Sequence, residues 1–273
     1  MQNPIVIFDA GIGSYSITEK LRNAFPMADL IYLADRASFP YGHKSLPELF
    51  RSIYSTLYFL QKNYTPQLIV LASNVPSITV LKQILPLIDV PIVGVYPPVK
   101  KALNISGSSL VGVLGVQSLV RSEQMVGYIE RNVVEGQQAL SFDASELVHL
   151  VESGDFLYEK KKTRSAVKRF ISNITNRHPE MDTFTLSSTH LPWLSDYFVS
   201  LFPAFNFLDP ADDVVASIDS VVDGKGETLG LVSTSQHGQF GIDDFKKMLN
   251  TLNIDICLEQ VVIPQKDTSG LCA

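Results

Sequence analysis

The chain has 273 residues, of which 45% are apolar and 18% are charged, a composition that excludes a disordered chain, a coiled coil and a collagen-like fibre. At about 150 residues per domain, this length indicates two modest domains. The 22 basic and 28 acidic residues give a net charge of −6, which argues against a surface that collects the phosphates of nucleic acid or anionic lipid. We therefore expect a packed globular protein without a nucleic-acid or membrane partner.

Signals for secretion, membrane insertion and metal binding are missing from the sequence. No basic segment or long apolar segment precedes the first apolar run, and no stretch approaches the ~18 uninterrupted apolar residues of a spanning helix. Cys257 and Cys272 are the only cysteines, too few for a disulfide framework or a cysteine-based metal site. The histidines show no metal-ligand spacing with one another. A cytoplasmic protein with no metal ion is predicted.

Short apolar runs rich in β-forming residues alternate with longer segments of helical period. The runs are continuously apolar, as in strands that are covered on both faces. They predict strands at 4–8, 29–33, 67–72, 91–95, 109–114, 182–186 and 228–232. The clearest helix is 45–62, which opens on a capping box of Ser45 and Glu48. Strands and helices in this order predict parallel sheets joined by right-handed crossovers.

Residues that favour turns interrupt this alternation near positions 100 and 205. They predict a first domain made of residues 1–97 and 208–273, with a second domain of residues 98–207 inserted into it. The predicted fold class is α/β, with two pseudo-symmetric domains of mostly parallel sheets flanked by helices. In such folds ligands bind at the carboxyl ends of the strands, so we expect the active site in the interdomain cleft.

A faint internal similarity links residues 68–77 with residues 182–192. Each segment runs from an apolar strand into hydroxyl and amide side chains and then into a helix, a junction whose free backbone N–H groups can bind a carboxylate. The polar residues at the two junctions are Ser73, Asn74, Ser188, Thr189 and His190. The residue types leave two interpretations open at each junction: substrate contact and catalysis, or helix capping and ordinary packing.

Asp9 follows the first predicted strand and precedes a loop that contains Gly11 and Gly13. Taken alone, this aspartate is either a functional group or the N-cap of the next helix. A dinucleotide fingerprint is a further alternative, with Asp35 as the ribose-binding acid, but Ser16 stands where that fingerprint requires a third glycine.

Two other segments carry candidate residues. Phe39-Pro40-Tyr41-Gly42 indicates a turn, with a binding loop as the alternative. Glu152 follows an apolar run and would, taken alone, be a solvated helix end. Catalysis of the Ser-His-Asp type is compatible with the residue types present, although the chain has no G-x-S-x-G nucleophile elbow.

Four motifs occur in an order that is specific as a set. They are Phe8-Asp-Ala-Gly-Ile-Gly-Ser14, Tyr32-Leu-Ala-Asp35, Phe39-Pro-Tyr-Gly42 and Leu150-Val-Glu-Ser-Gly154. The set resembles the glutamate racemase family of the aspartate/glutamate racemase superfamily, whose corresponding motifs are Phe-Asp-Ser-Gly-Val-Gly-Gly, Tyr-Leu-Gly-Asp, Val-Pro-Tyr-Gly and Leu-Val-Glu-x-Gly. The resemblance extends over essentially the whole chain.

The resemblance implies a cofactor-independent isomerase that interconverts L- and D-glutamate and supplies the D-form for peptidoglycan. Its two-base mechanism uses one cysteine on each face of the substrate Cα, one to remove a proton and one to deliver it. The two cysteine segments of the family read here Ala72-Ser-Asn-Val-Pro-Ser77 and Ser187-Ser-Thr-His-Leu-Pro192. Ser73 and Ser188 therefore stand at both cysteine positions. The implied partner is a small amino-acid substrate, and the assembly considered is a homodimer.

The resemblance also assigns roles to the neighbouring residues. Asp9 is implied near the first base, and His190 with Glu152 near the second, where they can accept a serine proton. Substrate contacts are implied for Ala10, Pro40, Tyr41, Gly42, Asn74, Val75 and Thr189. Ala10 and Val75 replace hydroxyl residues of the family, so each loses one hydrogen bond worth about 0.5–1.5 kcal/mol.

Three hypotheses follow from this pattern. The first is a glutamate racemase that works with serines. The second is a catalytically weak or inactive homologue that binds a small amino or dicarboxylic acid. The third is a racemase whose serines were introduced to trap a substrate. The apolar residues Ala10 and Val75 favour the second hypothesis over the third, because trapping a substrate gives no reason to alter them.

Overall fold

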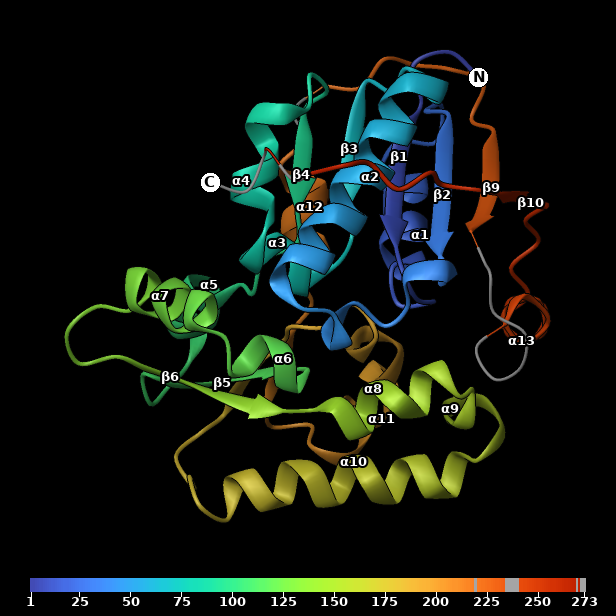
Figure 1. The fold of residues 1–273 in the computed structure, drawn as a ribbon. Coiled ribbons are helices and arrows are strands. Elements are labelled where there is room, and N and C mark those ends of the chain that lie inside the picture. Colours follow the sequence, from blue (N-terminus) through green and yellow to red (C-terminus); the bar gives the residue numbers. More distant parts are fainter. Residues whose placement is uncertain (219, 234–240, 269, 271–273) are drawn as a thin grey trace. The chain divides into compact units, whose positions relative to one another are not determined.

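The computed structural model describes residues 1–218, 220–233, 241–268 and 270 (Figure 1). The chain divides into two compact units, one made of residues 1–95 and 211–273 and the other of residues 96–210. We call them unit 1 and unit 2. That they are folding domains with boundaries after residues 97 and 207 stays a prediction.

Unit 1 is built on a parallel sheet with the strand order β10-β9-β2-β1-β3-β4. Its strands are β1 (Ile5–Asp9), β2 (Leu30–Asp35), β3 (Leu68–Leu71), β4 (Ile92–Gly94), β9 (Thr228–Ser233) and β10 (Leu258–Val261). Its helices are α1 (Tyr15–Ala24), α2 (Leu46–Tyr64), α3 (Asn74–Thr79), α4 (Leu81–Ile84), α12 (Ala211–Ala216) and α13 (Ile242–Thr251), with the 3-10 turns η1 (Arg36–Ser38), η2 (Tyr41–His43) and η3 (Leu85–Leu87).

The central strand β1 shows why the sheet of unit 1 needs helices on both faces. All five of its residues are buried, and successive side chains point to opposite faces of a strand. Val6 and Phe8 join a cluster with apolar residues of α2 and α4. Ile5 and Ile7 join a second cluster with residues of α1 and α12. The continuous apolar run in the sequence is therefore the signature of a strand between two helical layers.

Unit 2 has a second parallel sheet with the order β6-β5-β7-β8 (Figure 1). Its strands are β5 (Leu110–Gly115), β6 (Gln138–Asp143), β7 (Thr183–Leu186) and β8 (Asn206–Leu208). Its helices are α5 (Val99–Ile105), α6 (Gln117–Val120), α7 (Glu123–Asn132), α8 (Ser145–Glu152), α9 (Asp155–Tyr158), α10 (Lys160–Thr175) and α11 (Ser195–Leu201), with the 3-10 turn η4 (Leu191–Leu194). The predicted α/β fold class with parallel sheets flanked by helices is confirmed.

The long helix predicted at 45–62 is α2, and it begins as the capping residues require. Ser45 is its N-cap, and the carboxylate of Glu48 accepts hydrogen bonds from the backbone N–H of Ser45 at 2.9 Å and from its hydroxyl at 2.6 Å. Three strands, β6, β8 and β10, were not predicted. Among the described helices, none combines the length and the apolar character needed to cross a bilayer.

Gly112 in β5 is a position where the sheet of unit 2 tolerates no side chain. A Cβ atom there would lie 2.5 Å from Cδ1 of Phe184, which is fully buried and stacks on Phe207. Overpacking of this kind costs about 1–3 kcal/mol, so Gly112→Ala should lower the free energy of unfolding by that amount in urea titrations. Gly127→Ala in α7 is the control, because its Cβ meets only the flexible end of Arg131. Equal stabilities of the two variants would contradict this packing.

Candidate active site

In unit 1, the candidate residues lie at the carboxyl edge of three neighbouring strands. Asp9 ends β1, which pairs with β2 on one side and with β3 on the other. The segment 39–42 follows β2, and the segment 73–75 follows β3. Parallel strands bring their carboxyl ends to one edge of the sheet. The topology therefore places all candidate residues of unit 1 along one edge.

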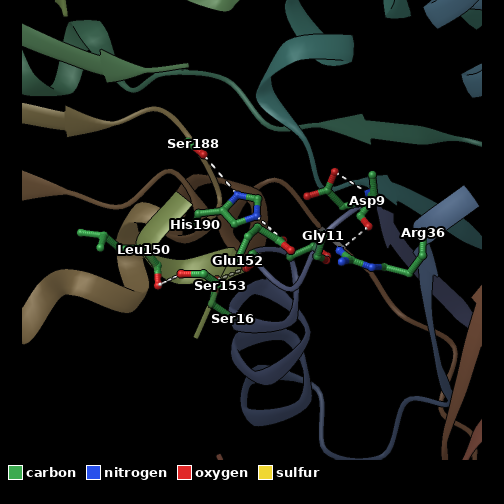
Figure 2. Close-up of polar contacts among 12 residues, drawn as sticks. Asp9, Gly11, Ser16, Arg36, Leu150, Glu152, Ser153, Ser188 and His190 are labelled. Atoms are coloured by element: carbon green, nitrogen blue, oxygen red, sulfur yellow. Dashed lines mark hydrogen bonds and ion pairs between the residues drawn. The ribbon is translucent and has the colours of Figure 1, made fainter. Parts of the chain in front are cut away.

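The loop after β1 is held by buried polar side chains. Asp9 is 3% exposed, and its Oδ1 accepts the N–H of Ala10 at 2.7 Å. Arg36 donates to the carbonyl oxygen of Ala10 at 3.2 Å (Figure 2). The hydroxyl of Tyr32 donates to the carbonyl oxygen of Gly11, also at 3.2 Å. These hydrogen bonds hold the backbone of the loop in place. The burial of Arg36 was not predicted, since an arginine directly after a strand carries no burial signal.

The alternative that Asp9 caps the next helix is wrong. Helix α1 begins only at Tyr15, and its N-cap residue is Ser14. The five residues between the end of β1 and α1 thus form a separate loop, and Asp9, the last residue of the strand, does not cap this helix.

The junction after β3 carries polar groups that the fold itself leaves unused. Ser73 occupies the N-cap position of α3, but its side chain makes no capping hydrogen bond. Asn74 is 3% exposed, and its Nδ2 donates to the carbonyl of Val95 at 3.1 Å. Its buried Oδ1 accepts no hydrogen bond from any described residue. A buried acceptor without a donor costs about 1–3 kcal/mol, so this amide is not explained by capping alone.

The segment after β2 is a pair of 3-10 turns, η1 and η2, around Phe39 and Pro40. Tyr41 is buried, and its hydroxyl donates to Oδ2 of Asp35 at 3.3 Å. A cavity of about 430 Å³ lies beside this segment within unit 1, with Pro40 and Asp35 in its wall. Gly42 is half-buried within η2. The segment therefore forms the predicted turn, and it also borders a pocket.

Asp35 does not fit the role of a ribose-binding acid. It is 2% exposed, and besides Tyr41 the hydroxyl of Thr56 donates to it at 3.4 Å. Burial raises the pKa of Asp35 above its usual value, although hydrogen bonds from Ser38, Tyr41 and Thr56 oppose this. A carboxyl surrounded by protein hydroxyls in this way is a structural group of unit 1.

The raised pKa of Asp35 predicts the direction in which the stability of the protein changes with pH. The folded state disfavours its charged form, so its contribution to stability is complete below the unfolded pKa of about 3.9 and is lost as pH rises through the folded pKa. Asp35→Asn cannot ionise. We expect its free energy of unfolding, relative to the parent, to rise as the pH increases above about 4 in urea titrations.

Asp182 is the matched control for this prediction because its pKa moves the other way. Burial would raise its pKa, but hydrogen bonds from the Gly107 N–H, Thr183 and Ser106 outweigh burial and lower it. Its contribution is therefore present at neutral pH and is lost as pH falls, so Asp182→Asn should lower stability at neutral pH. The same pH trend in both variants would contradict the two assignments.

In unit 2, Ser188, His190 and Glu152 form a hydrogen-bonded chain (Figure 2). The Oγ of Ser188 lies 3.3 Å from Nδ1 of His190, and Nε2 of His190 lies 2.6 Å from Oε1 of Glu152. All three residues are at most 7% exposed. A carboxylate is an acceptor, so it assigns the ring proton to Nε2 and leaves the lone pair of Nδ1 for the proton of Ser188. The arrangement can remove a proton from the serine hydroxyl.

The backbone explains how Glu152 reaches this position. Helix α8 ends at Glu152, and the hydroxyl of Ser153 donates to the carbonyl of Leu150 at 3.4 Å. Gly154 then turns the chain into α9 with φ +78°, a conformation that L side chains rarely adopt. A Cβ at this glycine would also lie 2.8 Å from the ring of Tyr158. The motif around Glu152 is thus the end of helix α8, and the last side chain of that helix is the one that contacts His190.

The structure brings the sequence-predicted residues together within each unit. Ser188, Thr189 and His190 follow β7, and they meet Glu152 from α8. Thr189 is buried beside them. The alternative that Glu152 is a solvated helix end is wrong, since its side chain is 2% exposed. Within the described ranges, no group of three His, Cys, Asp or Glu side chains is arranged to hold a metal ion.

Two all-parallel sheets flanked by helices, with polar residues gathered at the strand ends, define a two-unit α/β protein of the kind that binds small ligands at those ends. A glutamate racemase isoform of Bacillus anthracis has this fold, with a TM-score of 0.80 at 20% identity over 97% of this chain and 99% of that one. Escherichia coli glutamate racemase, solved with L-glutamate and the activator UDP-MurNAc-ala, gives 0.79 at 24% identity over 96% and 99%.

Curated sequences extend this likeness beyond the fold. Glutamate racemase of Sphingopyxis alaskensis is 30% identical over 225 residues, which cover 81% of this chain and 83% of that protein. Glutamate racemase of Sulfurihydrogenibium is 27% identical over 277 residues, or 99% of both. No family model matches the chain. The chain belongs to the glutamate racemase family, as its motifs predicted.

Proposed function

We propose that this protein interconverts L- and D-glutamate without a cofactor, by proton transfer at the substrate Cα. Membership of the glutamate racemase family supports the reaction class. Two solved relatives support the substrate class, because the Escherichia coli enzyme is described with L-glutamate and the Francisella tularensis enzyme with D-glutamate. Supplying D-glutamate for peptidoglycan, as a cytoplasmic isomerase and a homodimer, is part of the same proposal.

The observation that carries the proposal is the hydrogen-bonded chain from Ser188 through His190 to Glu152. A free thiol has a pKa of about 8.5 and is slightly ionised at neutral pH, whereas a serine hydroxyl needs an adjacent base. His190 supplies that base for Ser188, and Glu152 holds the imidazole in the useful tautomer and stabilises its charge once it is protonated. The serine that replaces the cysteine base thereby gains the assistance it needs.

The second base is proposed to be Ser73, with Asp9 beside it. Substrate contacts are proposed for Asn74, whose buried Oδ1 suits the ammonium group of an amino acid. The backbone of segment 40–42 and the buried Thr189 are proposed as further contacts. Ala10 and Val75 offer apolar side chains at their positions, which weakens substrate binding without removing the proton-transfer groups.

A second candidate function is binding of glutamate or a related acid without turnover. Ser73 favours it, because within the described chain its hydroxyl has no hydrogen-bond partner to serve as a base. Removal of a substrate proton by Ser73 would then be much slower than removal by Ser188, and the protein would act as a sensor of a small acid.

Circular dichroism of L-glutamate and D-glutamate incubated with the protein separates the two functions. A racemase brings both signals to zero, and Ser188→Ala should abolish the decay. Thermal unfolding in the presence of glutamate measures binding in parallel, since ligand at 100 times Kd adds about 2.7 kcal/mol. Constant signals with thermal stabilisation would replace the first function by the second, and constant signals without stabilisation would contradict both.

A further inference from the structure

The hydrogen-bonded residues Ser188, His190 and Glu152 have the composition of a nucleophilic serine site. This holds whether or not the protein transfers a proton at the Cα of an amino acid. A hydroxyl, an imidazole and a carboxylate follow one another through hydrogen bonds of 3.3 and 2.6 Å. This order of nucleophile, general base and orienting acid is recognised by geometry, not by sequence position. The absence of a G-x-S-x-G elbow in the sequence therefore does not count against it.

Burial protects this arrangement from water. The side chains of His190 and Glu152 are 9% and 2% exposed, and Ser188 as a residue is 7% exposed. In a site with little water, the carboxylate stabilises an imidazolium more strongly than it would at the surface. Ser188 can therefore transfer its proton to Nδ1 of His190, a base that Glu152 both orients and stabilises once it is protonated.

Backbone donors lie directly beside the hydroxyl along the chain. Within the part of the chain that the structure describes, no hydrogen bond uses the backbone N–H of Ser188 or that of His190. Both residues lie in the connection between β7 and η4, outside any strand or helix. Unused N–H groups next to a nucleophile are the donors that stabilise the oxyanion of acyl transfer.

We propose that Ser188 is an acylatable nucleophile and that this site hydrolyses esters of small carboxylic acids. The Oγ of Ser188 attacks the ester carbonyl carbon while its proton passes to Nδ1 of His190. The carbon–oxygen bond to the alcohol breaks, and the alcohol leaves with the proton held by His190. Water then attacks the acyl-serine, gives its proton to His190, and releases the carboxylic acid as Ser188 recovers its hydrogen.

The small exposure of Ser188 sets the class of substrate. A side chain that is almost enclosed admits a short acyl group more readily than a long or branched one. Acetyl esters with a good leaving group are therefore the expected substrates. This activity goes beyond the proposed racemisation, although it uses the same serine, and it requires neither Ser73 nor an amino-acid substrate.

A fluorophosphonate probe tests the proposal on the full-length protein. Attack of Ser188 forms an Oγ–P bond and expels fluoride, so the adduct remains on the residue and peptide mass spectrometry locates it. We expect one adduct per chain at Ser188, and at least a ten-fold slower labelling of Glu152→Gln. Ser195→Ala, at the start of α11, is the matched control and should label like the parent.

Hydrolysis of p-nitrophenyl acetate is the second readout, with an initial burst of one p-nitrophenol per chain followed by slower turnover. Location of the adduct in the parent protein needs no variant, so misfolding of a variant does not affect it. An adduct on other serines only, or labelling of Ser188 that is equally fast in Glu152→Gln, would overturn the proposal. Neither measurement contains glutamate, so their outcome is independent of the racemisation assay.

Discussion

Replacing Ser73 and Ser188 together with cysteine should raise the rate of glutamate racemisation by about 10²-fold or more. A thiol is a few per cent ionised at neutral pH and intrinsically nucleophilic. A serine hydroxyl reaches a comparable state only through its neighbours. His190 and Glu152 assist Ser188, whereas no described hydrogen bond involves the hydroxyl of Ser73. The gain should therefore come mainly from the cysteine at position 73.

Single variants make this expectation specific. Ser73→Cys alone should recover more activity than Ser188→Cys alone, because position 188 already has a base in hydrogen-bond reach. Ser195→Cys adds a thiol outside the candidate site and is the control for thiol chemistry as such. If the double variant binds glutamate but is no faster than the parent in the circular dichroism assay, the assignment of these two serines as proton-transfer residues is wrong.

Glu152→Gln should lower kcat for glutamate by roughly 10²–10⁴-fold. Glutamine keeps the shape of the side chain but removes the negative charge that stabilises a protonated His190. It can also present an N–H to the ring and thereby favour the wrong tautomer. KM should change little, because we do not place Glu152 in contact with the substrate. A merely structural role of Glu152 would instead appear as lost stability with unchanged kcat.

Glu146→Gln provides the matched control on the same helix. Glu146 forms an ion pair with Arg169, and both side chains are more than half exposed. Exposed pairs contribute little, typically about 0–1 kcal/mol. Stability and kcat of this variant should therefore stay close to those of the parent. Loss of activity in Glu146→Gln equal to that in Glu152→Gln would contradict a specific role of Glu152.

The sequence predicted all the inner strands and the edge strand β4, and it missed the three other edge strands for a physical reason. Strands such as β1 and β5 lie inside their sheets and are buried throughout, so their apolar runs are continuous. The missed strands β6, β8 and β10 are each at the edge of a sheet. Edge strands are covered less, and β6 for example is half-buried or exposed along its length. Their side chains therefore carry a weaker apolar signal.

The candidate site divides in the same way between local and long-range information. The proximity of Ser188 and His190 could be read from residues two apart at a strand end. The contact of His190 with Glu152, 38 positions away in the chain, was implied only by family resemblance, because no local pattern connects a helix end to a distant strand end. The burial of Arg36 under the Asp9 loop had no sequence signal. Such contacts depend on how distant segments of the chain pack together, and this packing cannot be read from the local residue types.

Exchange of the Cα hydrogen of glutamate in D₂O, followed by proton NMR, tests the proposed proton transfer most directly. With the parent protein, the Cα–H signals of L-glutamate and D-glutamate should both disappear as solvent deuterium replaces the proton, and Ser188→Ala should prevent this. Persistent Cα–H signals for both enantiomers, in a sample that glutamate demonstrably stabilises against heat, would contradict proton transfer by this site.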